Sequence, residues 1–196
     1  FLTYCVTGAL AQIWGTVLLV ALFAYRNFAV GTTYSKTETM QTALFGMIVL
    51  GERPSAGAMA ATLISLAGVV AISMAKSHLK AANLLRALSE KPTMMGIGSG
   101  AAFGIAAVSY RAASLSLGHP DFLMAAGYTL FTVLFIQTVA MTLWLALREP
   151  AQLRATARNW KTSSLVGIAG SLASMGWFTA MTIENAASVR ALGQGG

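Results

Sequence analysis

The chain has 196 residues, of which 56% are hydrophobic and only 10% are charged, and its mean hydropathy is +0.68. Soluble domains carry about 25% charged residues, so this chain has too few polar residues to cover a water-exposed surface. The composition excludes an ordinary soluble domain and predicts an integral membrane protein.

The membrane spans are predicted from the uncharged runs, because a spanning helix needs about 20 mostly apolar residues and charges mark its ends. Five of these uncharged runs are long enough to span the membrane by themselves. A sixth, residues 39–50, reaches spanning length only if Lys36 and Glu38 enter the membrane. We therefore expect an all-α polytopic bundle of six full helices, at about 1–25, 31–51, 54–75, 93–112, 122–147 and 162–183. A truncated seventh helix is expected from Asn185, so we interpret the chain as a fragment of a longer protein.

The links between these helices are expected to be tight turns at 52–54 and 119–121 and longer basic segments at 76–91 and 148–161. The net charge of +7 is concentrated in the two longer links. Basic links beside membrane spans are typical of a cytoplasmic side that faces anionic lipid. Membrane lipid is therefore an expected partner. Nucleic acid is not, because the basic residues do not alternate with aromatic ones in the pattern of a nucleic-acid-binding surface.

Signals of catalysis and of metal binding are missing from the sequence. His78 and His119 are isolated, no carboxylates are paired in the manner of a metal site, and no phosphate-binding loop is present. We therefore expect neither an enzyme nor a resident metal or cofactor.

Small residues recur on one face of two predicted helices, at Gly96, Gly100 and Gly104 and more weakly at Gly57, Ala61 and Ser65. Such stripes let helix backbones approach closely within lipid. Tight packing is the simpler interpretation, and a helix that slides during transport is the alternative.

The predicted second helix carries two charges. Glu38 lies fourteen residues before Glu52, which is roughly 21 Å of helix, and the hydrocarbon core is about 30 Å thick. Charges at such depth usually face a cavity or a partner. Tyr34, Glu38, Gln41 and Phe45 share one helix face, which suits the lining of a water-filled path. The alternative is a late helix start at the interface, with Lys36 snorkelling towards water.

A weak internal repeat relates the first helix junction to the end of the chain. At a shift of 156 residues, Tyr34 aligns with Arg190 and Glu38 with Gln194. Inverted repeats with a polar site at their interface are a common plan among transporters.

Two stretches resemble the drug/metabolite transporter superfamily, EamA type: KTETMQTALFGMIVLGERPSAGAMAATLISLAGVVAIS (residues 36–73) and GWFTAMTIENAASVRALGQ (residues 176–194). The shared pattern is a helix that ends in Gly-Glu, a polar turn with Pro, and a helix with a late Gly68. The resemblance implies ten helices in two inverted five-helix halves. This chain then holds the C-terminal part of the first half (1–75), a basic connector (76–92), and the N-terminal part of the second half (93–196).

The resemblance also implies a function: a secondary active transporter of a small organic metabolite or drug, working by alternating access, in a bacterial inner membrane. Proton coupling through Glu38 is left open, as is the choice between a monomer and a homodimer. The alternative function is a non-transporting membrane scaffold built on the same bundle. Family members usually have cytoplasmic termini, which would place both basic links outside, whereas the distribution of basic charge places them inside.

The resemblance implies a central cavity lined by polar and aromatic side chains of both halves. Glu38 and Arg190 are the expected charge pair across the pseudo-twofold axis. Trp14 and Trp177 either stack against an organic solute or are ordinary aromatic residues of the bundle. The candidate cavity residues are Trp14, Tyr34, Lys36, Glu38, Gln41, Tyr110, Arg111, Trp177, Asn185, Arg190 and Gln194.

Overall fold

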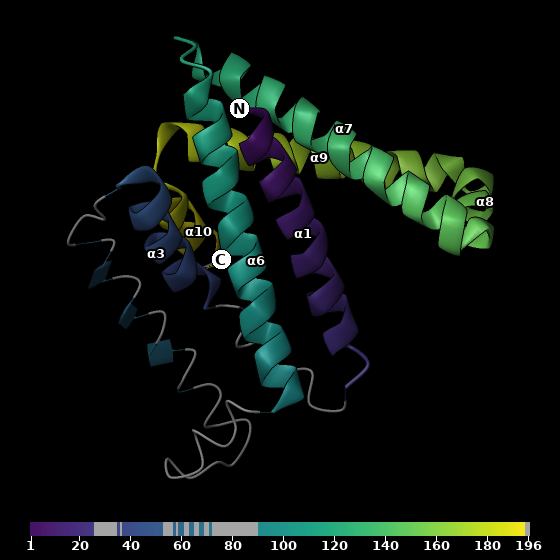
Figure 1. Ribbon diagram of the computed structural model, residues 1–196, viewed down its shortest axis with the longest axis horizontal. Coiled ribbons are helices and arrows are strands. Elements are labelled where there is room, and N and C mark those ends of the chain that lie inside the picture. Colours follow the sequence, from purple (N-terminus) through teal and green to yellow (C-terminus); the bar gives the residue numbers. More distant parts are fainter. Residues whose placement is uncertain are drawn as a thin grey trace.

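The computed structural model describes residues 1–25, 35, 37–52, 57, 59–60, 63–64, 67–68, 71 and 90–194. Four of the helices in these ranges, α1, α6, α7 and α9, are long and apolar enough to cross a membrane. The described part is thus all-helical and has the character of an integral membrane protein. Its helices are α1 (Leu2–Leu22), α3 (Glu38–Leu50), α6 (Lys91–Ser116), α7 (Phe122–Arg148), α8 (Pro150–Arg158), α9 (Trp160–Ile183) and α10 (Ala186–Gln194) (Figure 1).

Helix α3 is shorter in its described part than the helix predicted at 31–51. It has 13 residues, begins after Thr37 and ends at Gly51, whose φ of 65° is the left-handed conformation that glycine adopts easily. Thirteen residues of helix measure about 20 Å, which is less than the hydrocarbon thickness. Residues 26–34 and 36, and most of the predicted helix at 54–75, lie outside the described residues.

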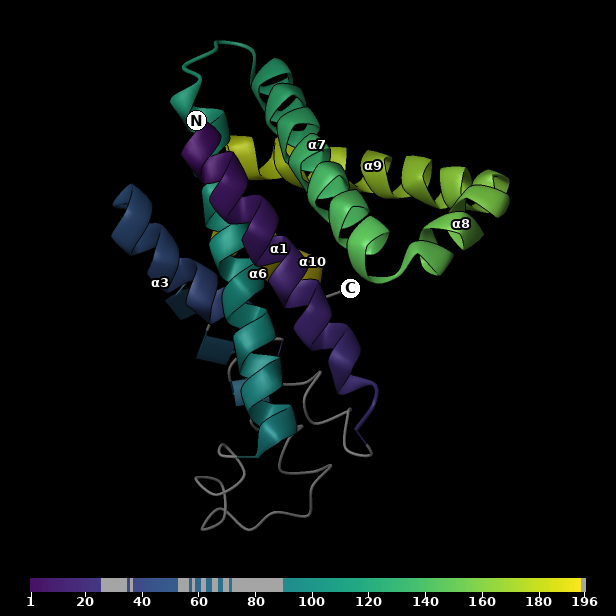
Figure 2. The ribbon, with the colours of Figure 1, turned by 45° about the vertical axis from the view of Figure 1, so that its right-hand side comes forward.

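Helix α6 is the centre of the bundle, and α1 lies along one of its faces (Figures 1 and 2). Glycines on α1 permit this contact: a Cβ atom at Gly8 would lie 2.5 Å from the Tyr110 ring, and one at Gly15 would lie 3.0 Å from the Phe103 ring. Two buried hydrogen bonds join the helices. Ser99 Oγ donates to the Gly15 carbonyl at 2.8 Å, and the Tyr110 hydroxyl donates to the Gly8 carbonyl at 3.0 Å.

Helix α3 packs on another face of α6, against the predicted glycine stripe. A Cβ atom at Gly100 would lie 2.9 Å from the Ser35 carbonyl oxygen, and one at Gly104 would lie 3.0 Å from Thr42 Oγ1. The interpretation of the stripe as a close-packing surface is confirmed at these two positions. Because the backbones touch here, the start of α3 is held inside the bundle, and Glu38 is buried.

Helix α6 extends beyond its predicted end near residue 112, and reaches Ser116. The sequence prediction ends a helix at a charge, and Arg111 breaks that rule because its charge is paired inside the bundle. The predicted turn at 119–121 is present. Gly118 has a positive φ of 60°, and Asp121 Oδ1 accepts hydrogen bonds from two backbone N–H groups in the first turn of α7.

The core lies where α1, α6, α7 and α9 cross. Alanines fill much of it, so the helices approach closely, and the rings of Tyr110 and Phe178 stack with centroids 4.5 Å apart. Its buried members are Cys5, Ala9, Ala106, Tyr110, Ala113, Ala126, Leu130, Val133 and Phe178.

Beyond this core, α7 and α9 diverge from α1 and α6 and form an arm, with α8 at its far end (Figures 1 and 2). The sequence predicted only a basic link at 148–161, so α8 was missed. Both long helices of the arm expose large apolar side chains, among them Phe131 and Leu172. Such surfaces suit contact with lipid.

Candidate functional site

Three candidate cavity residues meet at the junction of α3, α9 and α10. Arg190 Nε lies 3.0 Å from Glu38 Oε1, and both side chains are mostly buried, with 18% and 10% of their surface exposed. The Arg190 guanidinium also lies over the Trp177 ring, 5.0 Å from its centroid, as a cation–π contact. The structure thus brings the expected pair, Glu38 and Arg190, together, and their place in a solute cavity stays a prediction. We call these residues the Glu38–Arg190–Trp177 cluster.

The chain reversal after α9 brings Arg190 to this place. The Asn185 side chain accepts a hydrogen bond from the Ser188 N–H at 2.8 Å, which caps the start of α10. α10 then packs against α3. Gly193 permits close contact with α9, because a Cβ atom there would lie 2.1 Å from the Trp177 ring. Asn185 therefore contributes to the cluster as a helix cap.

Two hydrogen bonds hold the start of α3. Thr42 Oγ1 donates to the Glu38 carbonyl at 2.8 Å, and Gln41 Nε2 donates to Thr37 Oγ1 at 2.9 Å. Gln41 Nε2 also lies 3.4 Å from the Ile97 carbonyl of α6. Gln41 thus anchors the polar end of α3 to the bundle.

An open hollow of about 380 Å³ adjoins the cluster on α9 and α10. Apart from Trp177 its walls are small or aliphatic, so it presents apolar surface beside a buried ion pair. Its lining residues are Ala173, Gly176, Trp177, Ala180 and Val189.

Arg111 makes a second ion pair, with Glu52 at the end of α3. Its Nη1 group also donates to backbone carbonyls at the end of α9, to Met181 at 2.7 Å, to Thr182 at 3.3 Å, and to Glu184. These carbonyls have no partners within their own helix. Arg111 thus ties α6 to the ends of α3 and α9, which is a structural role that its prediction as a cavity residue did not include.

From the sequence, Glu52 is expected only to mark a membrane boundary. One signal could have identified it as a partner: the chain has only six Asp and Glu residues, and a buried arginine needs one of them.

The other candidate cavity residues lie apart from the cluster or outside the described residues. Tyr110 is buried in the core and donates to Gly8. Trp14 is 66% exposed on α1, a helix that contributes nothing to the cluster. Tyr34, Lys36 and the side chain of Gln194 lie outside the described residues. Their predicted roles stay predictions.

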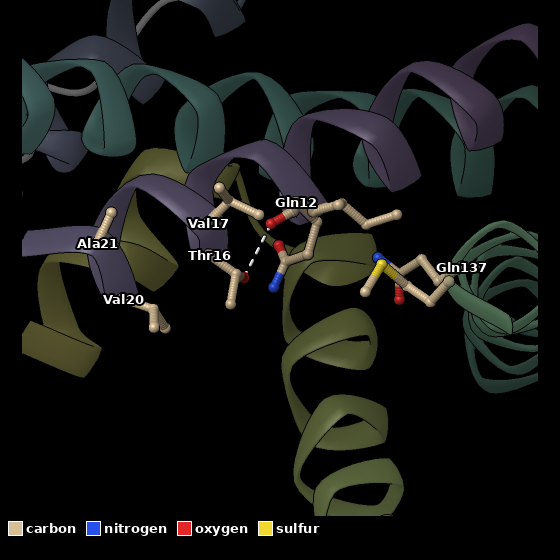
Figure 3. Close-up of a pocket in the computed structure, with 8 residues that line it drawn as sticks. Gln12, Thr16, Val17, Val20, Ala21 and Gln137 are labelled. Atoms are coloured by element: carbon tan, nitrogen blue, oxygen red, sulfur yellow. Dashed lines mark hydrogen bonds between the residues drawn. The ribbon is translucent and has the colours of Figure 1, made fainter. Parts of the chain in front are cut away.

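A larger hollow, of about 590 Å³, lies between α1 and α7 (Figure 3). Its polar residues, Gln12, Thr16 and Gln137, were not identified from the sequence. Gln12 and Thr16 differ by four and so share a helix face, which was the available signal, but their partner on α7 depends on how the helices cross.

Among the described residues, no group of three or more His, Cys, Asp or Glu side chains is placed to hold a metal ion. Comparison with protein-family models, curated proteins and solved structures gives no significant match to the chain.

Proposed function

We propose that the chain is part of an EamA-type secondary transporter, which moves a small organic metabolite or drug across a bacterial inner membrane by alternating access. The Glu38–Arg190–Trp177 cluster is the observation that carries this proposal. Its two charges come from segments about 150 residues apart in the sequence and are mostly buried. Charged groups are costly within a membrane and usually mark a pathway for ions or solutes.

The order of elements supports a repeat, and we propose the ten-helix inverted arrangement with six full spans in this chain. A long helix is followed by a shorter described helix twice, as α1 with α3 and as α9 with α10. The two shorter helices pack together and supply the two members of the ion pair. A site between corresponding elements of two repeats is the transporter plan.

The proposed coupling operates through the carboxylate of Glu38. A proton on this group removes its charge and weakens the hold of α3 on Arg190, so α3 and α10 can separate. Arg190 and Trp177 then become available to the solute. Loss of the proton restores the pair and closes this side of the path.

The test uses the complete protein in proteoliposomes. Counterflow of amino acids, nucleosides, polyamines and quaternary amines is measured for the wild type and for Glu38→Gln. We expect at least one solute to move with the wild type, and its pH-driven movement to be lost in Glu38→Gln. Glu149→Gln, at an exposed acid before α8, is the matched control and should transport normally.

Two results would count against the proposal. Normal pH-driven transport by a folded Glu38→Gln protein removes Glu38 from the coupling step. If the wild type moves no solute, the proposal that the protein is a transporter is rejected. The scaffold alternative then predicts that Glu38→Gln weakens a complex with another membrane protein.

A further inference from the structure

The hollow between α1 and α7 lies between two of the helices that are long and apolar enough to cross a membrane. Its volume of about 590 Å³ falls within the range of small-molecule sites, roughly 300–1,000 Å³. Most of its wall is aliphatic, and none of its lining side chains is titratable. The lining residues are Gln12, Ile13, Thr16, Val17, Val20, Ala21, Gln137 and Met141.

Gln12 brings an unsatisfied acceptor to this wall. Its Oε1 atom is buried and has no hydrogen-bond partner among the described residues. A buried polar atom without a partner costs free energy, and more so in apolar surroundings. Figure 3 shows the Gln12 and Gln137 side chains directed into the space between α1 and α7.

The neighbouring donors are already engaged. Thr16 Oγ1 donates to the backbone carbonyl of Gln12 at 2.9 Å. The Tyr110 hydroxyl donates to the Gly8 carbonyl, and Gln137 Nε2 is directed to that hydroxyl at 3.4 Å. None of these described donors reaches Gln12 Oε1, so a molecule that enters the hollow with an N–H or O–H group would supply the missing partner.

We propose that this hollow binds an uncharged organic molecule with an apolar body and one N–H or O–H donor, which it gives to Gln12. The aliphatic wall excludes a charged ligand, because an ion there would have no counter-charge. This inference deepens the proposed function by naming a class of solute, but the site binds whether or not transport follows.

The experiment compares two neutral probes of nearly equal shape. Benzanilide has an amide N–H, and phenyl benzoate has an ester oxygen in its place. Equilibrium dialysis of the complete detergent-solubilised protein, with empty micelles as the baseline, measures the affinity for each. We expect benzanilide to bind about tenfold more tightly than phenyl benzoate, as one net hydrogen bond allows.

Gln12→Met keeps the length of the side chain and removes its amide. It should lower benzanilide affinity about tenfold and leave phenyl benzoate unchanged. Its melting temperature should not fall, because the change also removes an unsatisfied buried acceptor. Gln152→Met, on the exposed helix α8, makes the same change elsewhere and should bind both probes normally.

Val17→Phe is a second variant, which fills the hollow without altering an amide, and it should weaken both probes. Equal affinity for the two probes would indicate an unspecific apolar groove, filled by lipid chains, and would overturn the proposal. Retention of neither probe above empty micelles, or unchanged benzanilide binding by Gln12→Met, would also overturn it. Specific binding without transport would instead reject the proposed function and leave this site standing.

Discussion

Arg111 shows how one residue can join three elements of a membrane bundle. It is 13% exposed, pairs with Glu52 and donates to carbonyls at the end of α9. An arginine is suited to this arrangement, because its planar group carries five donors in fixed directions. We infer that it stabilises the fold, whereas Arg190 belongs to the cluster of the proposed site.

We predict that Arg111→Met destabilises the protein by about 3–5 kcal/mol, because it leaves Glu52 and the α9 carbonyls without their partner. Glu52→Gln should cost less, since Arg111 keeps its carbonyl contacts. Thermal melts in detergent, monitored by circular dichroism, measure both. Arg154→Met, on exposed α8, is the control. A melt of Arg111→Met that matches the wild type would contradict the structural role.

At this scale the sequence predicted one ion pair and missed the other. The pairing of Glu38 with Arg190 followed from the expected symmetry of two halves. The partners of Arg111 include backbone carbonyls. Every residue has a carbonyl, but it is free to accept a side-chain hydrogen bond only in the last turn of a helix. No residue pattern identifies them, so an arginine near a predicted helix end was interpreted as part of the cavity.

At the scale of elements, the contact of α3 with α6 depends on glycines. A Cβ atom at Gly100 would lie 2.9 Å from a backbone oxygen, which cannot rotate away as a side chain can. We predict that Gly100→Ala moves α3 outward and destabilises the protein by about 1–3 kcal/mol. Thermal melts measure the loss, and a fall in transport is expected as Glu38 shifts away from Arg190.

Gly170→Ala is the matched control on α9, because no described atom outside its own helix turn lies within 4 Å of the Cβ position. Alanine favours a helix over glycine by up to about 1 kcal/mol, so this variant should be as stable as the wild type or slightly more so. An equal gain at Gly100 would show that α3 does not rest against α6 at this point.

Hydropathy predicted the long helices well, since α1, α7 and α9 lie close to their expected bounds. It did not predict α8, because the basic residues of 148–161 indicate only a link between two spans. The charges of α8 are spread along a short amphipathic helix, which hydropathy alone does not separate from a loop. The open angle of the arm also could not be predicted, because it depends on the packing of alanines at one crossing.

At the scale of the whole molecule, the far end of the arm concentrates basic and aromatic residues. Arg154 and Arg158 lie on α8, and Trp144 and Trp160 are exposed on the adjoining ends of α7 and α9. Exposed tryptophans are typical of the level of the lipid headgroups, and arginines beside them attract anionic lipid. The end of the arm is thus expected at the membrane surface.

We predict that anionic lipid stabilises the protein through these arginines. The wild type should melt at a higher temperature in nanodiscs that contain phosphatidylglycerol than in phosphatidylcholine alone, and the paired change Arg154→Gln with Arg158→Gln should remove most of the difference. Each basic residue near an anionic surface contributes about 1 kcal/mol, so the two together should be detectable. The gain should shrink as salt is raised, because exposed charges are screened beyond about 10 Å at 0.1 M. A gain that survives both the double change and high salt would place the lipid contact elsewhere on the molecule.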